Sequence, residues 1–179
     1  MAKFSSDGKR VITLNYDYAA QVWDAATGNQ LPRMNQGTDY HDRASFSPDG
    51  QRVVTATNSY GGANVKVFDA VTRKTTAEMN VPGGVNSMEF SPDGQRIVTA
   101  NSDDTVSVWD ATTGKQLAYL TGQTRRRTLF IMGGDPVPYL TASFSPNGRR
   151  VVTTSSEGLP AIYQIVSSDD VETIFGRLK

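Results

Sequence analysis

The feature that most constrains this chain is a sequence unit that occurs four times. Phe4, Phe46, Phe90 and Phe144 each precede a serine and a short turn sequence that ends in glycine. These phenylalanines are about 42 to 54 residues apart, which is the length of one small sheet in a repeat protein. A lone sheet of this size cannot bury both of its apolar faces in water. The sequence therefore predicts several similar sheets that stack on one another.

The third unit, residues 85–120, shows the pattern most regularly. It has four short β-prone runs separated by three turn signals. Ser-Pro-Asp-Gly at residues 91–94 predicts a type I turn, because proline fixes φ at the second position and glycine accommodates the fourth. Val106 and Val108 alternate with polar residues, as on one face of a strand. The unit is predicted to be a four-stranded antiparallel sheet.

The same signals divide the whole chain into four units within one predicted domain, residues 1–179. An aromatic residue follows each phenylalanine by about 19 to 22 residues, where the third strand should end. The predicted units are residues 1–34, 42–79, 85–120 and 139–175. Two segments depart from the pattern, namely a longer loop at residues 58–62 and an inserted connection at residues 121–138.

Composition argues against several classes of partner. The formal net charge is zero and the sequence pI is about 6.6, so neither nucleic acid nor an anionic membrane is the expected partner. No apolar run has the length of a membrane span, and the first residues do not form a signal peptide. The chain has no cysteine, which suits a reducing compartment. We therefore expect a cytoplasmic location.

The sequence also offers little for catalysis. It has a single histidine, His41, and neither a Gly-x-Ser-x-Gly motif nor a phosphate-binding glycine loop followed by lysine. Asp103 and Asp104 lack the ligand series of a calcium loop, so turn capping is the preferred interpretation. We predict no enzyme activity, no cofactor and no metal site.

The amino-acid sequence of the third unit resembles the WD-repeat β-propeller family. Within that family it resembles the bacterial members most. The resemblance rests on Phe-Ser-Pro-Asp-Gly, Val-Thr-Ala, Thr-Val-Ser-Val-Trp-Asp and Ala-Thr-Thr-Gly-Lys, in that order. It implies an all-β fold in which four-stranded antiparallel blades stand around an axis. The family's signature dipeptide matches Trp-Asp in the first and third units and only the aspartate in the second, at Trp23, Asp24, Phe68, Asp69, Trp109 and Asp110. Trp23 and Trp109 are expected to pack between blades.

The resemblance implies a protein-interaction scaffold, and loop lengths indicate which face binds. Turns at one end of the predicted strands are short in every unit, whereas both irregular segments lie at the other end. Exposed tyrosine and arginine often anchor interfaces. The candidate contacts are Tyr16, Tyr18, Tyr60, Arg125, Arg126, Arg127 and Phe130. The arginines could bind an anion or be a solvated loop, and residues 129–132 could dock a partner or form an extra strand.

Four units make half of a large propeller ring, so closure needs more blades. A second copy of the chain, giving a homodimer, or further sequence could supply them. The favoured function is a non-enzymatic scaffold that binds a protein partner. The alternative is the C-terminal sensor or regulatory segment of a larger bacterial signalling protein, such as an NTPase or kinase.

Overall fold

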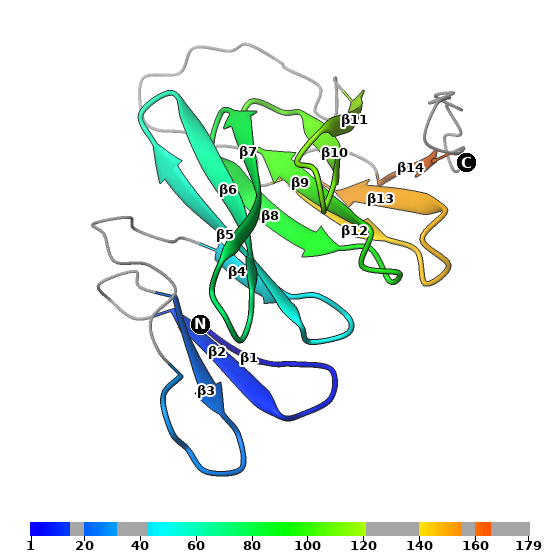
Figure 1. Cartoon of the computed structure of the whole chain (residues 1–179). Helices are drawn as coiled ribbons and strands as arrows, with labels where there is room; N and C mark the ends of the chain where they lie inside the picture. Colours follow the sequence, from blue (N-terminus) through cyan, green and yellow to red (C-terminus); the bar gives the residue numbers. More distant parts are fainter. Residues whose placement is uncertain (15–19, 32–42, 121–139, 155–159, 166–179) are drawn as a thin grey trace.

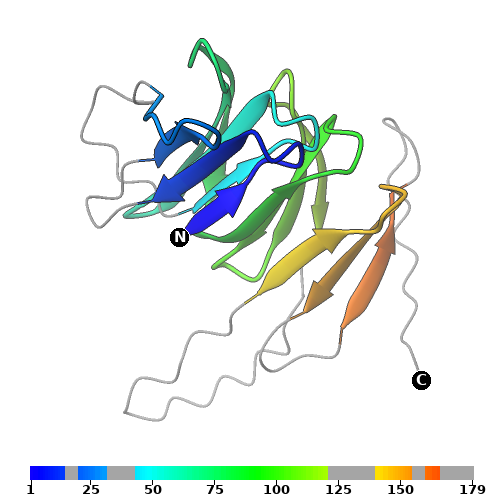
Figure 2. The same cartoon turned by 90° about the horizontal axis from the view of Figure 1, so that it is seen from below.

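The computed structural model describes residues 1–14, 20–31, 43–120, 140–154 and 160–165. In these residues the chain forms four antiparallel sheets and no helix. Figures 1 and 2 show the sheets side by side in chain order, with the first sheet at one end of the array and the fourth at the other. The predicted all-β array of stacked blades is confirmed.

Blades 1 and 2 each begin with a short strand that leads into a glycine-containing turn (Figure 1). Blade 1 has the strand order β1-β2-β3, with β1 (Ala2–Phe4), β2 (Arg10–Leu14) and β3 (Ala20–Asp24). Blade 2 has the order β4-β5-β6-β7, with β4 (Arg43–Phe46), β5 (Arg52–Ser59), β6 (Gly62–Asp69) and β7 (Thr75–Pro82).

Blades 3 and 4 repeat this arrangement. Blade 3 contains β8 (Val85–Phe90), β9 (Arg96–Asn101), β10 (Val106–Asp110) and β11 (Gln116–Leu120). The described part of blade 4 contains β12 (Thr141–Phe144), β13 (Arg150–Thr154) and β14 (Ala161–Gln164). In the described residues of the predicted fourth strand of blade 1 there is one bridge, between Trp23 and Gln30, and residues 32–34 lie outside the described residues. The predicted fourth strand of blade 4, at residues 171–175, lies outside the described residues.

The predicted loop at residues 58–62 is wrong, because these residues extend a hairpin. Ser59 pairs with Gly62, which leaves Tyr60 and Gly61 as a two-residue turn between β5 and β6. Gly61 has φ +98°, a conformation that glycine adopts without steric cost. Gly62 also pairs with Pro82 of β7, so it has ladder partners on both sides. The insertion therefore lengthens the strands.

The signature aspartates of blades 1, 2 and 3 hold the turns that follow the third strand of these blades. Asp110 Oδ1 accepts hydrogen bonds from the backbone N–H groups of Thr113 and Thr112, at 2.7 and 3.0 Å, and from Thr113 Oγ1 at 2.9 Å. Asp24 and Asp69 make the same set of three bonds in their own blades. The bond from the Thr113 N–H to the charged carboxylate lowers the pKa of Asp110.

Each blade has two different faces, which we name the aromatic face and the aliphatic face. The aromatic face of blade 3 carries Phe90, Ile97, Thr99 and Trp109, and equivalent residues occupy it in the other blades. The aliphatic face of blade 3 carries alternate positions of the same strands, including Val98 and Val108. The aliphatic faces of blades 1, 2 and 3 each pack on the aromatic face of the next blade and form a buried core with it.

The two tryptophans differ in their surroundings. Trp109 is 5% exposed and lies in the core between blades 2 and 3, so its predicted inter-blade packing is confirmed. Trp23 is only partly buried, because no described blade covers the aromatic face of blade 1. In both cases the indole Nε1–H donates to a threonine on the neighbouring strand, Thr99 at 3.0 Å or Thr13 at 2.8 Å.

Candidate interaction surface

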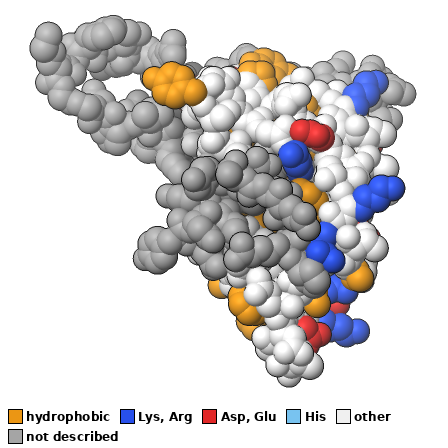
Figure 3. All heavy atoms as spheres, turned by 60° about the vertical axis from the view of Figure 1, so that its left-hand side comes forward, with side chains coloured by type: hydrophobic (Ala, Val, Ile, Leu, Met, Phe, Trp, Pro, Cys, Tyr) orange, Lys and Arg blue, Asp and Glu red, His pale blue; other side chains and the backbone are white. Residues whose placement is uncertain are grey.

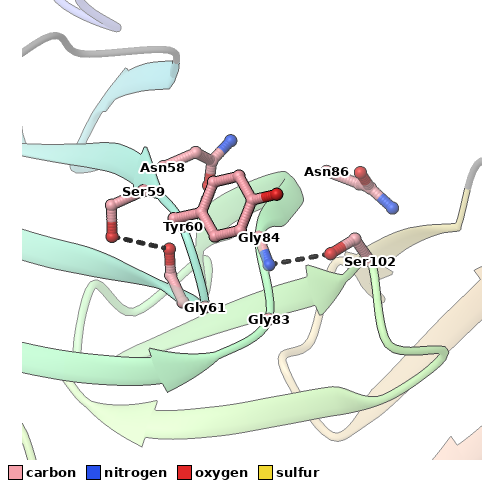
Figure 4. A pocket seen from close by; sticks show the side chains of 9 residues that line it. Asn58, Ser59, Tyr60, Gly61, Gly83, Gly84, Asn86 and Ser102 are labelled. Carbon is pink, nitrogen blue, oxygen red and sulfur yellow. Dashed lines mark hydrogen bonds between the residues drawn. The ribbon is translucent and has the colours of Figure 1, made fainter.

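The clearest candidate surface is an open hollow beside the Tyr60 turn. It lies where the β5–β6 hairpin, the link from β7 to β8, and the turn from β9 to β10 meet (Figure 4). The hollow has a volume of about 530 Å³. It is lined by Asn58, Ser59, Tyr60, Gly61, Gly62, Gly83, Gly84, Asn86 and Ser102. We call these residues the Tyr60 hollow.

Hydrogen bonds made by Asn58 and Ser102 fix the floor of the Tyr60 hollow. Asn58 Oδ1 accepts from the Val85 N–H at 2.7 Å, and Asn58 Nδ2 donates to the Val85 carbonyl at 3.3 Å. Ser102 Oγ accepts from the Gly84 N–H at 2.7 Å, and the Ser102 N–H donates to the Gly84 carbonyl at 2.7 Å. The Asn58 bonds join blade 2 to blade 3, and the Ser102 bonds extend the pairing of β8 with β9 inside blade 3, so the floor is held in one geometry.

Glycines bring the backbone to the surface of the hollow. A Cβ on Gly62 would lie 2.9 Å from the Val81 carbonyl oxygen, and one on Gly84 would lie 3.2 Å from Ser102 Oγ. Gly83 has φ +77°, and a Cβ there would lie 3.1 Å from Asp103 Cγ. Side chains larger than glycine would therefore disturb these contacts. The lining offers main-chain groups, amides and hydroxyls, with Tyr60 fully exposed at its edge.

The structure places one of the sequence-predicted contact residues at this surface, which is Tyr60. The other six, Tyr16, Tyr18, Arg125, Arg126, Arg127 and Phe130, lie outside the described residues. Sequence reasoning missed the glycine pair at 83 and 84, together with Asn58, Asn86 and Ser102. The Gly-Gly sequence between two predicted strands was the available signal, because adjacent glycines often mark a close approach of the backbone.

The residues that line the Tyr60 hollow are uncharged, and one nearby charged side chain, Arg43, donates from Nε to the carbonyl of Asn86 at 2.9 Å. Asp103, in the adjoining turn, accepts hydrogen bonds from the Thr105 hydroxyl at 2.6 Å and from the Thr105 N–H at 3.2 Å, so it caps the turn as predicted. Figure 3 shows hydrophobic side chains in separate patches on one face of the molecule, with Lys and Arg side chains along one side.

Within the part of the chain that the structure describes, no helix has the length and hydropathy needed to cross a membrane.

Stacked antiparallel sheets that follow one another in chain order define an array of the β-propeller type. Residues 74–110 match the WD40 family, described as WD domain, G-beta repeat. This range runs from the outer strand of blade 2 to the end of β10, and it includes the Trp109-Asp110 dipeptide. The resemblance to WD-repeat proteins that the sequence indicated is therefore confirmed.

Two known proteins show the extent of the similarity. The chain is 32% identical over 114 residues to the U3 small nucleolar RNA-associated protein 15 homolog of Xenopus laevis, a match that covers 64% of this chain and 22% of the relative. The crystal structure of the computationally designed Ika8 protein superposes with a TM-score of 0.70 at 22% identity, covering 92% of this chain and 45% of that one. The chain thus spans about a fifth of the relative and under half of the designed protein.

The comparisons support some sequence-based expectations and leave others as predictions. WD40 repeats generally serve as non-enzymatic scaffolds for protein interaction, which agrees with the expected class of function. The relative is a frog protein, so similarity to bacterial members stays a prediction. The relative is named as RNA-associated, so the expected exclusion of nucleic acid has no support from it. Neither comparison bears on a role as a sensor segment of a signalling protein.

Proposed function

We propose that the chain is a non-enzymatic scaffold that binds an extended, uncharged segment of a partner protein at the Tyr60 hollow. The observation that carries the proposal is the combination of a fully exposed Tyr60 with a glycine-lined floor. Tyrosine is enriched among residues that dominate binding energy, because it has a large apolar ring and a polar hydroxyl. The glycines allow a peptide backbone to come close to the floor.

The rigidity of the floor supports binding in a second way. Asn58 makes two hydrogen bonds across the junction of blades 2 and 3, and Ser102 makes two with Gly84 at the start of blade 3. A surface that is already ordered loses less conformational entropy when a ligand binds than a mobile loop does. The hollow is therefore suited to a ligand that supplies its own backbone N–H and C=O groups, as an extended peptide does.

The absence of charge in the lining determines which ligand class we favour. RNA binding depends strongly on Lys and Arg that neutralise phosphates, and none of the residues that line the Tyr60 hollow is Lys or Arg. Acidic or phosphorylated peptides need the same cationic groups. An uncharged polar peptide is the ligand whose chemistry matches Asn, Ser, Gly and Tyr.

The test is selection of peptides from a random display library on the wild-type chain, followed by titration of the enriched peptides. Tyr60→Ala removes the exposed ring, and we expect it to weaken binding by roughly tenfold or more. The matched control is Val71→Ala, because Val71 is 56% exposed in the β6–β7 turn, at the other end of the β6 strand. Enrichment of no peptide, or equal binding by Tyr60→Ala, would contradict the proposal. Binding of single-stranded RNA that Tyr60→Ala abolishes would replace the peptide with RNA as ligand.

A further inference from the structure

We infer that a second copy of this chain covers the aromatic face of blade 1 with the aliphatic face of its own blade 4. Two such contacts, related by symmetry, would close a ring from two chains. This inference rests on the blade ends, not on the Tyr60 hollow, so it stands or falls separately from the proposed function. The chain makes one such contact three times between its own blades.

An arginine at the start of the second strand joins each blade to the next. Arg10 Nη1 donates to the Gly50 carbonyl at 2.8 Å, Arg52 Nη2 to the Gly94 carbonyl at 2.6 Å, and Arg96 Nη2 to the Gly148 carbonyl at 2.9 Å. In every case the acceptor glycine ends the first turn of the following blade. The blades thus connect through one repeated, directional hydrogen bond.

Two of these arginines, Arg52 and Arg96, also lie over a phenylalanine ring of the following blade. The Arg52 guanidinium carbon lies 5.3 Å from the centre of the Phe90 ring, and that of Arg96 lies 5.6 Å from the centre of the Phe144 ring. These are distances at which a cation and an aromatic face attract each other. Phe90 and Phe144 also belong to the apolar cores between blades, and they are only 7% and 8% exposed.

Blade 1 has the turn glycine and the phenylalanine ring that such an arginine contacts, but no arginine among the described residues lies on them. Phe4, the equivalent of Phe90, is 69% exposed. Gly8 has φ +67°, as Gly50 has, yet a Cβ on Gly8 would meet nothing within 4 Å. A Cβ on Gly94 would instead lie 2.9 Å from Arg52 Nη2. The turn and the ring are in place, and the surface on which an arginine would lie is open.

Blade 4 has the arginine that donates in this contact. Arg150 occupies the position of Arg10, Arg52 and Arg96, two residues after the turn glycine, but it is exposed whereas they are half-buried. Within the described residues its guanidinium has no glycine carbonyl to bind. The aliphatic face beside it carries Val152 and Ile162, which remain partly exposed where the equivalent residues of blade 3 are buried.

The aromatic face of blade 1 and the aliphatic face of blade 4 are complementary, so each can contact the other in a second copy of the chain. Arg150 of one copy would donate to Gly8 of the other and lie over its Phe4. A contact between unlike faces makes either a closed ring or an open filament. Two copies of four blades give eight, within the roughly four to eight blades of known propellers, whereas three copies would exceed it. The match to this chain covers 45% of the designed protein with the same fold. The rest of that protein is long enough to form a second array of four blades.

The experiment is size-exclusion chromatography with light scattering on the wild type, Phe4→Asp, Arg150→Glu and the control Arg149→Glu. Arg149 is the exposed neighbour of Arg150 and makes no contact with the next blade's turn in the repeated pattern. We expect the wild type and Arg149→Glu at twice the 19.4 kDa chain mass. Phe4→Asp and Arg150→Glu should run as single chains, with the dissociation constant raised by roughly tenfold or more. Their circular dichroism should match the wild type, since both sites are exposed.

A wild type that stays a single chain at every concentration would overturn the inference, and so would masses that grow without limit. Retention of the double mass by both Phe4→Asp and Arg150→Glu would also overturn it, because the pair would then form through another surface. Peptide binding at the Tyr60 hollow should be unchanged in Phe4→Asp, so failure of either proposal can be recognised separately.

Discussion

Alanine at Gly114 and at Gly28 should destabilise the chain by different amounts, although the two glycines occupy equivalent turns. Gly114 has φ +72° and Gly28 has φ +68°, so alanine meets the same backbone strain at both positions, about 1 to 2 kcal/mol. A Cβ on Gly28 would touch nothing within 4 Å, whereas one on Gly114 would lie 2.4 Å from the Glu78 carbonyl oxygen of blade 2. The overlap forces the backbone of blade 3 or blade 2 to move, which costs about 1 to 3 kcal/mol more.

The assay is urea unfolding followed by circular dichroism, with all variants carrying Phe4→Asp so that single chains are compared. We expect Gly28→Ala to lower the free energy of unfolding by about 1 to 2 kcal/mol and Gly114→Ala by about 2 to 5 kcal/mol. The slope against urea should stay unchanged, because both variants expose the same surface when they unfold. Equal losses for the two alanines would refute the contact between the Gly114 turn and β7.

Three further predictions concern buried hydrogen bonds, acid stability and the junction of blades. Thr99→Val should lower the free energy of unfolding by about 1 to 3 kcal/mol, because it leaves the buried Trp109 Nε1–H unpaired, and loss of less than 0.5 kcal/mol in urea titration would count against that bond. Because the pKa of Asp110 is lowered in the folded chain, its contribution to stability should be present above about pH 4 and lost as the pH falls through the folded-state pKa. Thermal melts from pH 7 to 3 should therefore fall less steeply for Asp110→Asn, and an identical pH profile would disprove the linkage. Asn58→Ala removes both hydrogen bonds to Val85, so it should lower the free energy of unfolding and the free energy of peptide binding by about 1 kcal/mol each. Unchanged peptide affinity would show that the peptide does not bind at the floor of the hollow.

The sequence predicted the blades because each is marked locally. Phe90, the Ser-Pro-Asp-Gly turn and the Trp109-Asp110 dipeptide lie within one unit, and their spacing follows the strand and turn lengths. Residues 58–62 were misjudged because turn-forming residue types indicated a loop, whereas pairing with β7 made them a longer hairpin. That pairing depends on a strand formed later in the chain, which local propensity does not report.

The contacts between blades were harder to predict than the blades. A Gly-x-Arg sequence occurs at Arg10, Arg52, Arg96 and Arg150, yet repetition alone does not show that the arginine reaches the next blade's glycine. The floor of the Tyr60 hollow was missed for the same reason, because Asn58 and Val85 are far apart in the sequence and meet only when blades stack. Tyr60 could be identified from the sequence because it lies in a segment of turn-forming residues, 58–62, and tyrosine often anchors interfaces.

Disulfide trapping tests the pairing of two copies most directly, because the chain has no cysteine of its own. A Cβ on Gly50 would lie 3.3 Å from Ser5 Cβ of the preceding blade, close to the separation that a disulfide bridges. The equivalent positions at the proposed contact are Ser145 of one copy and Gly8 of the other. The double variant Ser145→Cys with Gly8→Cys should run at twice the chain mass on a non-reducing gel and at the single mass after reduction, while each single variant should not cross-link. A double variant that stays at the single mass under oxidising conditions would contradict the account.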